Sequence, residues 1–353
     1  MNRYNKLMKS SISRKEFLKI SGLSLSSLAF SPNIGFSGLK PSDAIAYIRV
    51  AVDEVRIFDE PSYFSNVVRR IKRDQLIFVY EKFDSSEGPD FNPTWYRVED
   101  GYLHTAYTQP VETNLQNVQT FVREEGQVFE VSVPLTQSYR NTKTYGWQKI
   151  YRLYYQSNHW VTGVEKGPDG ALWYKITDEL LKIDYFVLAS HMKAVPDADF
   201  EPISGNVDAG QKRVEVSIAE QRLWAYEGSE LVMDRKISTG IPGMESDNGI
   251  PTATPRGNFN ISNKMPVRHM GDGRITDDIS AYELPGVPWV SYFHETGVAF
   301  HGTYWHENYG NEMSHGCVNM TPEDSKWLFR WLTPSVDATS INTNGFGTRV
   351  KVY

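Results

Sequence analysis

This sequence has a single cysteine, no excess of basic residues and no long apolar run. Each of these features excludes a class of protein. The 353 residues contain one cysteine, Cys317, so no internal disulfide framework can form. Lysine and arginine number 37 against 43 aspartate and glutamate residues, and the net charge of −6 argues against a nucleic-acid partner. No stretch is apolar over the ~20 residues that a transmembrane helix needs, so we expect no permanent membrane span.

The first 38 residues have the composition of an export signal with a short linker. Ile20 to Phe30 form an apolar stretch too short to span a bilayer. The segment from Ser13 to Lys19 is similar to a twin-arginine (Tat) motif, with Lys15 in place of the second arginine, so Tat and Sec export both stay open. We expect a protein exported to the periplasm, the cell wall or the exterior. The basic residues that precede the apolar stretch are Arg3, Lys6, Lys9, Arg14, Lys15 and Lys19.

A chain of this length predicts two to three domains, and the first reads as a small β domain over 45–112. Its short β-type runs are separated by turn-forming clusters such as 84–89. The succession Trp95-Tyr96-Arg97-Val98, then Asp100-Gly101-Tyr102-Leu103, resembles a bacterial SH3-like (SH3b) module. The predicted strands are 54–58, 75–81, 95–98 and 102–106.

A second, diverged SH3-like module is predicted over 115–196. Trp173-Tyr174-Lys175-Ile176 repeats the first Trp-Tyr run 78 residues later, and Asp184-Tyr185-Phe186-Val187 follows it. Two copies at this spacing indicate tandem domains, although a chance recurrence of Trp-Tyr pairs is an alternative. Such modules would contact wall glycan or peptide, or would only space and brace the domain that follows.

After a Pro- and Asp-rich linker over 194–209, the last domain is predicted to span 208–353. The alternation over 213–218 predicts a strand with one apolar face, and 348–353 predicts a closing strand. Residues 263–290 read as an irregular loop whose Tyr282 and Trp289 line a groove or lie buried beneath it. Thr321 and Pro322 predict the start of one helix. The whole chain is therefore predicted to be mainly β.

The chemistry of the chain is concentrated between His301 and Asn319. A free cysteine has a pKa of about 8.5 and attacks as thiolate, so Cys317 needs a base. His315 is two residues away and His301 sixteen, and a loop could return His301 onto the thiol from a neighbouring strand. With His306, these side chains are also possible zinc ligands, but the usual Cys-x₂₋₄-Cys spacing is missing. We predict no metal and no cofactor.

His301-Gly302-Thr303 and Ser314-His315-Gly316-Cys317-Val318-Asn319 resemble the signature of the L,D-transpeptidase (YkuD-like) family. Ser238-Thr239-Gly240 and the turn after Thr254 are similar to earlier parts of that domain. The resemblance implies a β-sandwich catalytic domain with a cysteine nucleophile and a histidine proton carrier. The implied roles are Cys317 as nucleophile, His301 as proton donor and acceptor, Ser314 as the carbonyl that orients His301, His315 and Gly316 as loop and oxyanion amides, and Tyr304, Trp305 and Asn319 as substrate-binding residues.

The resemblance also implies the substrate, which is the stem peptide of peptidoglycan. The thiol would attack the carbonyl of a diamino acid with an L centre and release D-alanine. Transfer to an amine gives a 3→3 cross-link, as in a cell-wall biosynthetic transferase, whereas transfer to water makes the enzyme an L,D-carboxypeptidase. A third possibility is a wall-binding protein without catalytic activity.

Overall fold

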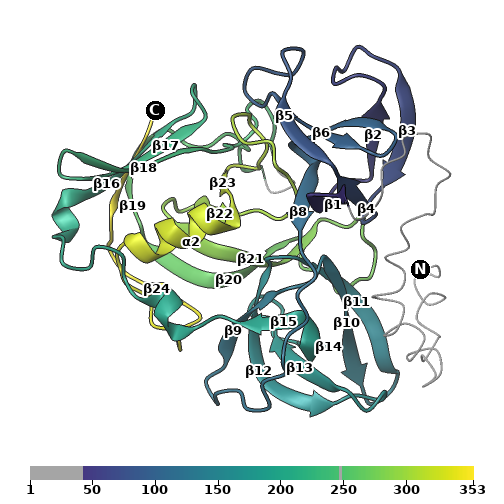
Figure 1. The fold of residues 1–353 in the computed structure, drawn as a ribbon. Coiled ribbons are helices and arrows are strands. Elements are labelled where there is room, and N and C mark those ends of the chain that lie inside the picture. The colour runs from purple at the N-terminus through teal and green to yellow at the C-terminus, as the bar shows by residue number, and fades with distance from the viewer. Residues whose placement is uncertain (1–42, 246–248) are drawn as a thin grey trace. The chain divides into compact units, whose positions relative to one another are not determined.

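The computed structural model describes residues 43–245 and 249–353, which are mainly β and contain one α-helix (Figure 1). The predicted export signal, 1–38, lies outside the described residues. In the described ranges, no helix combines the length and the apolar character that crossing a membrane requires. The chain forms two compact units. One contains Glu112–Val195 and Arg268–Gly286, and the other contains 43–111, Pro196–Val267 and Val287–Tyr353.

The first β module consists of eight strands and lies within the second of these units. Its sheets have the orders β4-β1-β8 and β3-β2-β7-β6-β5, and they share a core that includes Ile48, Val55 and Leu103. The predicted run 54–58 is β2, whereas β1, β3 and β8 were not predicted and β5 was predicted only at its first residue. β3 is almost wholly exposed, so it carries no apolar alternation. The elements are β1 (Ala46–Val50), β2 (Glu54–Phe58), β3 (Val67–Lys72), β4 (Leu76–Val79), β5 (Glu81–Asp84), β6 (Thr94–Val98), β7 (Gly101–His104), the 3₁₀ turn η3 (Thr105–Tyr107) and β8 (Thr108–Val111).

The second β module is one seven-stranded antiparallel sheet of order β11-β10-β14-β13-β12-β9-β15. Each Trp-Tyr pair occupies a strand and is buried, with Trp95 at 0% and Trp173 at 2% exposure. In both modules the strand that contains the Trp-Tyr pair is followed by another strand, a 3₁₀ turn and a last strand, as β6-β7-η3-β8 in the first and β13-β14-η4-β15 in the second. The repeated sequence therefore has a repeated element order, while an SH3-like identity stays a prediction. The elements are β9 (Gln127–Val131), β10 (Leu135–Thr142), β11 (Gly146–Tyr154), β12 (Asn158–Lys166), β13 (Leu172–Thr177), β14 (Asp184–Leu188), η4 (Ala189–His191) and β15 (Met192–Ala194).

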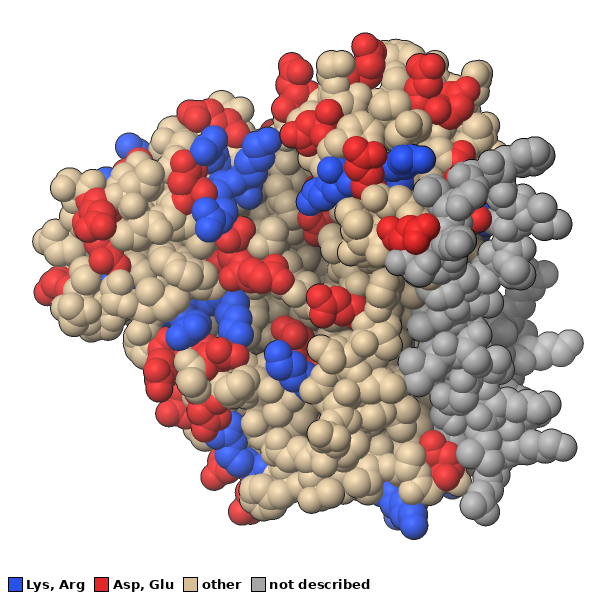
Figure 2. Space-filling model, viewed as in Figure 1, with Lys and Arg blue, Asp and Glu red and all other residues tan. Residues whose placement is uncertain are grey.

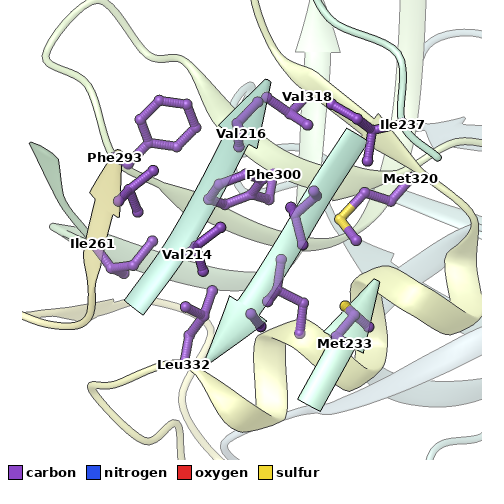
Figure 3. Close-up of a cluster of buried hydrophobic side chains, with 14 of the residues drawn as sticks. Val214, Val216, Met233, Ile237, Ile261, Phe293, Phe300, Val318, Met320 and Leu332 are labelled. Carbon is purple, nitrogen blue, oxygen red and sulfur yellow. The ribbon is translucent and has the colours of Figure 1, made fainter. Parts of the chain in front are cut away.

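The remaining strands build a sandwich of two five-stranded sheets, of orders β18-β17-β16-β25-β19 and β23-β22-β21-β20-β24. Val214 and Val216 from the first sheet and Phe300 and Val318 from the second enter one core (Figure 3). The predicted strands over 213–218 and 348–353 are β16 and β25, which pair in parallel. The strands are β16 (Lys212–Ser217), β17 (Arg222–Glu227), β18 (Glu230–Lys236), β19 (Gly257–Asn260), β20 (Asn263–Gly271), β21 (Glu283–Tyr292), β22 (Ala299–Gly302), β23 (Val318–Met320), β24 (Thr343–Asn344) and β25 (Arg349–Val352).

The prediction of an irregular loop over 263–290 was wrong, because most of this span is the two long strands β20 and β21. Both strands are buried for most of their length, so they lack a polar face and show no alternation. Prolines within both strands also read as breakers in the sequence. Trp289 is 2% exposed and packs against Phe200 and Phe329, whereas Tyr282 is exposed.

The helix α2 (Pro322–Trp331) begins where the sequence predicts it. The hydroxyl of Thr321 accepts a hydrogen bond from the amide of Asp324, at 3.1 Å. Leu328 and Trp331 enter the sandwich core, and α2 lies against β22. Short 3₁₀ turns at η5 (Asp197–Phe200) and η6 (Ala209–Gln211) precede the sandwich.

Candidate active site

The parallel pairing of β22 with β23 places His301 opposite Asn319, and Cys317 lies in the bend that immediately precedes β23. Phe300 is in register with Val318, and His301 with Asn319. Phe300 and Val318 both point into the core, so strand alternation turns His301 and Asn319 to the opposite face. Neighbouring strands lie about 4.8 Å apart, which places two residues distant in sequence within side-chain range.

Two glycines of this region are required by close packing. A side chain at Gly302 would come within 2.9 Å of the Cα of Pro322, where α2 begins. Gly316 has a φ of +120°, and a side chain at the facing Gly240 would approach the Cα of Gly316 to 2.7 Å. These contacts explain why small residues flank both reactive positions.

The Ser314 side chain holds the turn that leads to Cys317. Its Oγ donates to the carbonyl of Cys317 at 2.5 Å and accepts the amide of Gly316 at 3.1 Å. The backbone of Ser314 is bound by a different segment, because its amide donates to Thr239 and its carbonyl accepts the amide of Ile241. At rest the Gly316 amide is therefore engaged and not directed at a substrate.

Cys317 is half-buried and is a free thiol. Its Sγ lies 3.8 Å from the carbonyl of Gly297, to which the thiol donates. Burial raises the pKa of the Cys317 thiol to about 11, and a backbone hydrogen bond with Ala299 offsets only part of this effect. The thiol is therefore protonated at neutral pH.

His301 is 2% exposed, and its Nδ1 lies 3.1 Å from the carbonyl of Gly302. Burial lowers the pKa of His301 to about 4, so the imidazole is neutral at pH 7. With Nδ1–H donating to Gly302, the other nitrogen is left as a proton acceptor. No hydrogen bond joins this ring to Cys317 or to Ser314 in the described part of the chain. The Ser314 carbonyl accepts the amide of Ile241, and its expected role in orienting His301 stays a prediction.

The residues expected to bind substrate have different environments. Trp305 is half-buried and its ring centre lies 5.8 Å from that of His301, so it forms a wall beside the imidazole. Tyr304 is 2% exposed and lies edge-on to Trp305. Asn319 is 1% exposed, and its Nδ2 lies 2.9 Å from Nε2 of His306. Tyr304 and Asn319 therefore lie behind the exposed surface of the site, and His315 lies exposed upon it.

Two residues that the sequence did not single out support this site. The Oγ1 of Thr254 accepts the amide of Gly240 at 2.9 Å and donates to the carbonyl of Gly316 at 2.7 Å. The Nε2 of Gln221 donates to Oγ1 of Thr239, and its Oε1 accepts the backbone amide of Thr239. Both contacts join distant segments, and only the Thr-Pro turn at Thr254 gave a signal in the sequence.

Among residues 43–245 and 249–353, no three or more His, Cys, Asp or Glu side chains form a group suited to a metal ion. Basic and acidic side chains are intermixed over the face drawn in Figure 2.

Residues 211–352 match the YkuD family model, whose description is "L,D-transpeptidase catalytic domain". This part of the chain is therefore similar to the YkuD L,D-transpeptidase catalytic domain, and in the structure it is mainly β. A curated relative, the putative L,D-transpeptidase YciB of Bacillus subtilis (strain 168), is 27% identical over 134 residues, which are 35% of this chain and 62% of that protein. The match thus spans less than two thirds of the relative.

Two solved structures from Enterococcus faecium are also similar. An L,D-transpeptidase crystal structure is 26% identical, with 40% of this chain and 50% of that chain covered and a TM-score of 0.30. The catalytic domain solved by NMR is 28% identical, with coverage of 40% and 96% and a TM-score of 0.29. Because both TM-scores lie below 0.5, we base no conclusion on these two similarities.

Proposed function

We propose that the protein is an exported peptidoglycan L,D-transpeptidase in which Cys317 is the nucleophile and His301 carries the proton. The observation that supports this most directly is the pairing of β22 with β23, which places His301 opposite Asn319, two residues after Cys317, within residues that match the YkuD family model. A neutral imidazole and a protonated thiol suit general-base catalysis, because the base is free to accept a proton when attack begins.

In the acylation step, His301 takes the thiol proton while Sγ attacks the carbonyl carbon of the L-centre diamino acid. The tetrahedral intermediate collapses as the bond to D-alanine breaks, and His301 returns the proton to the leaving amine. A thioester on Cys317 remains. In the second step an amine of another stem peptide attacks the thioester, His301 removes its proton, and Cys317 leaves as the thiol with that proton.

The amides around His315, Gly316 and Cys317 would stabilise the oxyanion. The Gly316 amide would first have to leave Ser314 Oγ, which it contacts at rest. Losing one donor of this kind typically lowers kcat by ~10²- to 10³-fold. Trp305 would contact the peptide directly, and Tyr304 and Asn319 would support the wall from behind.

Incubation of the purified protein with a disaccharide tetrapeptide tests this function. We expect release of D-alanine and a dimer mass, with both abolished in Cys317→Ala. An inactive wild type, or turnover that persists in Cys317→Ala, would contradict the proposal. Conversion of monomer to tripeptide without dimer would instead assign an L,D-carboxypeptidase.

Export and contact with the wall through the two β modules are also proposals. Cell fractionation of the full chain and of a chain without residues 1–38 tests export, and only the full chain is expected outside the cytoplasm. Sedimentation of each form with purified wall sacculi tests binding, and recovery of all protein in the supernatant would argue against it.

A further inference from the structure

The segment 304–308, which follows the active-site strand β22, is held by the first β module. Arg49 of β1 is 1% exposed, and its Nη2 donates to the carbonyl of Tyr304 at 2.8 Å. Asn92 donates from Nδ2 to the carbonyl of Glu307 and to Oδ1 of Asn308, both at 3.2 Å. The amide of Glu307 donates to the carbonyl of Ala106 at 2.9 Å. These contacts join positions more than 200 residues apart in the sequence.

Both donors are themselves fixed inside the first β module. The guanidinium of Arg49 also binds Gln109 through Nε and Nη2 and pairs with Asp74 at 2.9 Å. The carbonyl of Asn92 lies 2.7 Å from Nε2 of His104. A buried guanidinium with this many partners has one allowed position, so it defines the position of the Tyr304 carbonyl.

The same segment contacts the reactive face of β22 and β23. The ring of Trp305 lies beside His301, with the ring centres 5.8 Å apart. His306 contacts the side chain of Asn319, and the carbonyl of Asn308 accepts a hydrogen bond from Ser238 at 3.1 Å. Segment 304–308 therefore links the first β module on one side with the neighbours of Cys317 on the other.

We propose that Arg49 and Asn92 are positioning residues for the active-site segment 304–308, which makes the first β module a working part of the active site. The role of Arg49 and Asn92 in turnover rests on the proposed function. Their effect on the reactivity of the Cys317 thiol does not depend on it. Loosening this segment would admit water beside the buried imidazole, which Trp305 contacts, and would thereby increase the hydration of the half-buried thiol. Displacements of about 1 Å near reacting groups can lower turnover by ~10²-fold.

The test uses Asn92→Ala and Arg49→Lys in the full chain, with Asn66→Ala as the matched control. Asn66 also lies in the first β module, but it pairs with Asp59 in an exposed turn. Cys317 is the only cysteine, so alkylation by iodoacetamide followed by mass spectrometry reports on this thiol alone. Circular dichroism and thermal unfolding establish that each variant is folded.

We expect faster alkylation at pH 8 in both variants, because hydration lowers the pKa of the Cys317 thiol. Each unit by which this pKa falls increases the fraction of thiolate ~10-fold while the pKa stays above the pH. We also expect kcat on the disaccharide tetrapeptide to fall by ~10- to 100-fold with KM changed less than ~3-fold. Folded variants that are alkylated at the rate of Asn66→Ala would overturn the proposal, whatever their turnover. If the wild type fails to turn over the peptide, the alkylation rates still decide the positioning role, and the proposed function fails separately.

Discussion

At the scale of single residues, burial sets the protonation states of Cys317 and His301. It raises the pKa of the thiol to about 11 and lowers the pKa of the imidazole to about 4. Each group therefore prefers its neutral form, and an imidazolium–thiolate pair is disfavoured at rest. In the proposed reaction, proton transfer from Cys317 to His301 would therefore accompany attack on the substrate.

This protonation state predicts the acid limb of the pH profile. Protonated His301 cannot accept the thiol proton, so kcat/KM should fall only as the pH drops towards about 4. We expect His301→Asn to lower kcat by ~10²- to 10⁴-fold. The measurement is kcat/KM for D-alanine release between pH 3.5 and 9, limits chosen to bracket both the shifted and the ordinary histidine pKa of about 6.5. A midpoint at that ordinary value would contradict the buried neutral base.

Glu307 is a second residue whose titration should be measurable. Burial raises its pKa from 4.5 to about 7, with Lys82 opposing and Glu323 adding to the shift. The folded state then keeps a proton that the unfolded state loses, so the contribution to stability is lost as the pH rises from 4.5 to 7. The loss should be ~2 kcal/mol for this half-buried side chain.

Urea unfolding of Glu307→Gln at pH 4.5 and pH 8 checks this prediction. The variant should match the wild type at the lower pH and exceed it by ~2 kcal/mol at the higher one. Glu295→Gln, at an exposed position, is the control and should follow the wild type at both. A constant difference between Glu307→Gln and wild type would show that the carboxyl does not titrate in this range.

At the scale of elements, the C-terminal end of α2 is capped by two buried lysines. Lys264 donates to the carbonyls of Phe329, Leu332 and Pro334 at 2.5, 2.8 and 2.8 Å. Lys212 donates to the carbonyl of Trp331 at 3.0 Å. Burial lowers the pKa of Lys264 to about 7, so at neutral pH this amine stabilises the free carbonyls mainly as a hydrogen-bond donor, and its charge opposes their partial negative charge only in the protonated form. The caps come from β20 and β16, one from each sheet of the sandwich.

Lys264→Met should therefore lower the free energy of unfolding by ~3 kcal/mol, because it leaves buried carbonyls without a donor. Lys326→Met is the control on the same helix. Lys326 forms a partly exposed ion pair with Asp199 at 2.7 Å, so its loss should cost less than ~1 kcal/mol. Chemical denaturation measures both, and equal effects would argue against the cap.

At the scale of the whole molecule, Arg268–Gly286 belongs to a compact unit with Glu112–Val195, although it lies between sequence segments of the other unit. His269 is the buried centre of this part. Its Nδ1 lies 2.6 Å from Asp178 and its Nε2 lies 2.9 Å from Glu283. Burial alone would lower the pKa of His269, but the two carboxylates outweigh it and raise that pKa.

The raised pKa defines a pH dependence of stability. The contribution of His269 is fully present below about 6.5 and is lost as the pH rises through the higher folded value. His269→Gln leaves two buried carboxylates without a cation and should cost ~3 to 5 kcal/mol at pH 7. Urea unfolding at pH 5, 7 and 9 should show the largest difference from wild type where the native His269 is charged and the carboxylates are ionised. His294→Gln, at a half-buried position, is the control, and an equal effect of the two changes would refute the role of the cluster.

Local sequence determined much of this molecule. The strand β2, the buried Trp-Tyr runs and the Thr321 cap follow from alternation, turn residues and capping chemistry within a few residues. The signature also identified His301 and Cys317 as the reactive candidates, because its residues are nearly contiguous. Where a segment is buried on both sides, as in β20 and β21, alternation disappears and the prediction failed.

Tertiary structure alone decided what surrounds those two reactive candidates. The hydrogen bond of Thr254 to Gly316, the bond of Gln221 to Thr239 and the contact of Arg49 with segment 304–308 all depend on which backbones meet in space. Such contacts join residues up to 255 positions apart and leave no periodicity in the sequence. The two residues proposed to react, His301 and Cys317, can thus be recognised from a short stretch of sequence. Their burial, which sets the pKa of each, arises only when distant segments pack together.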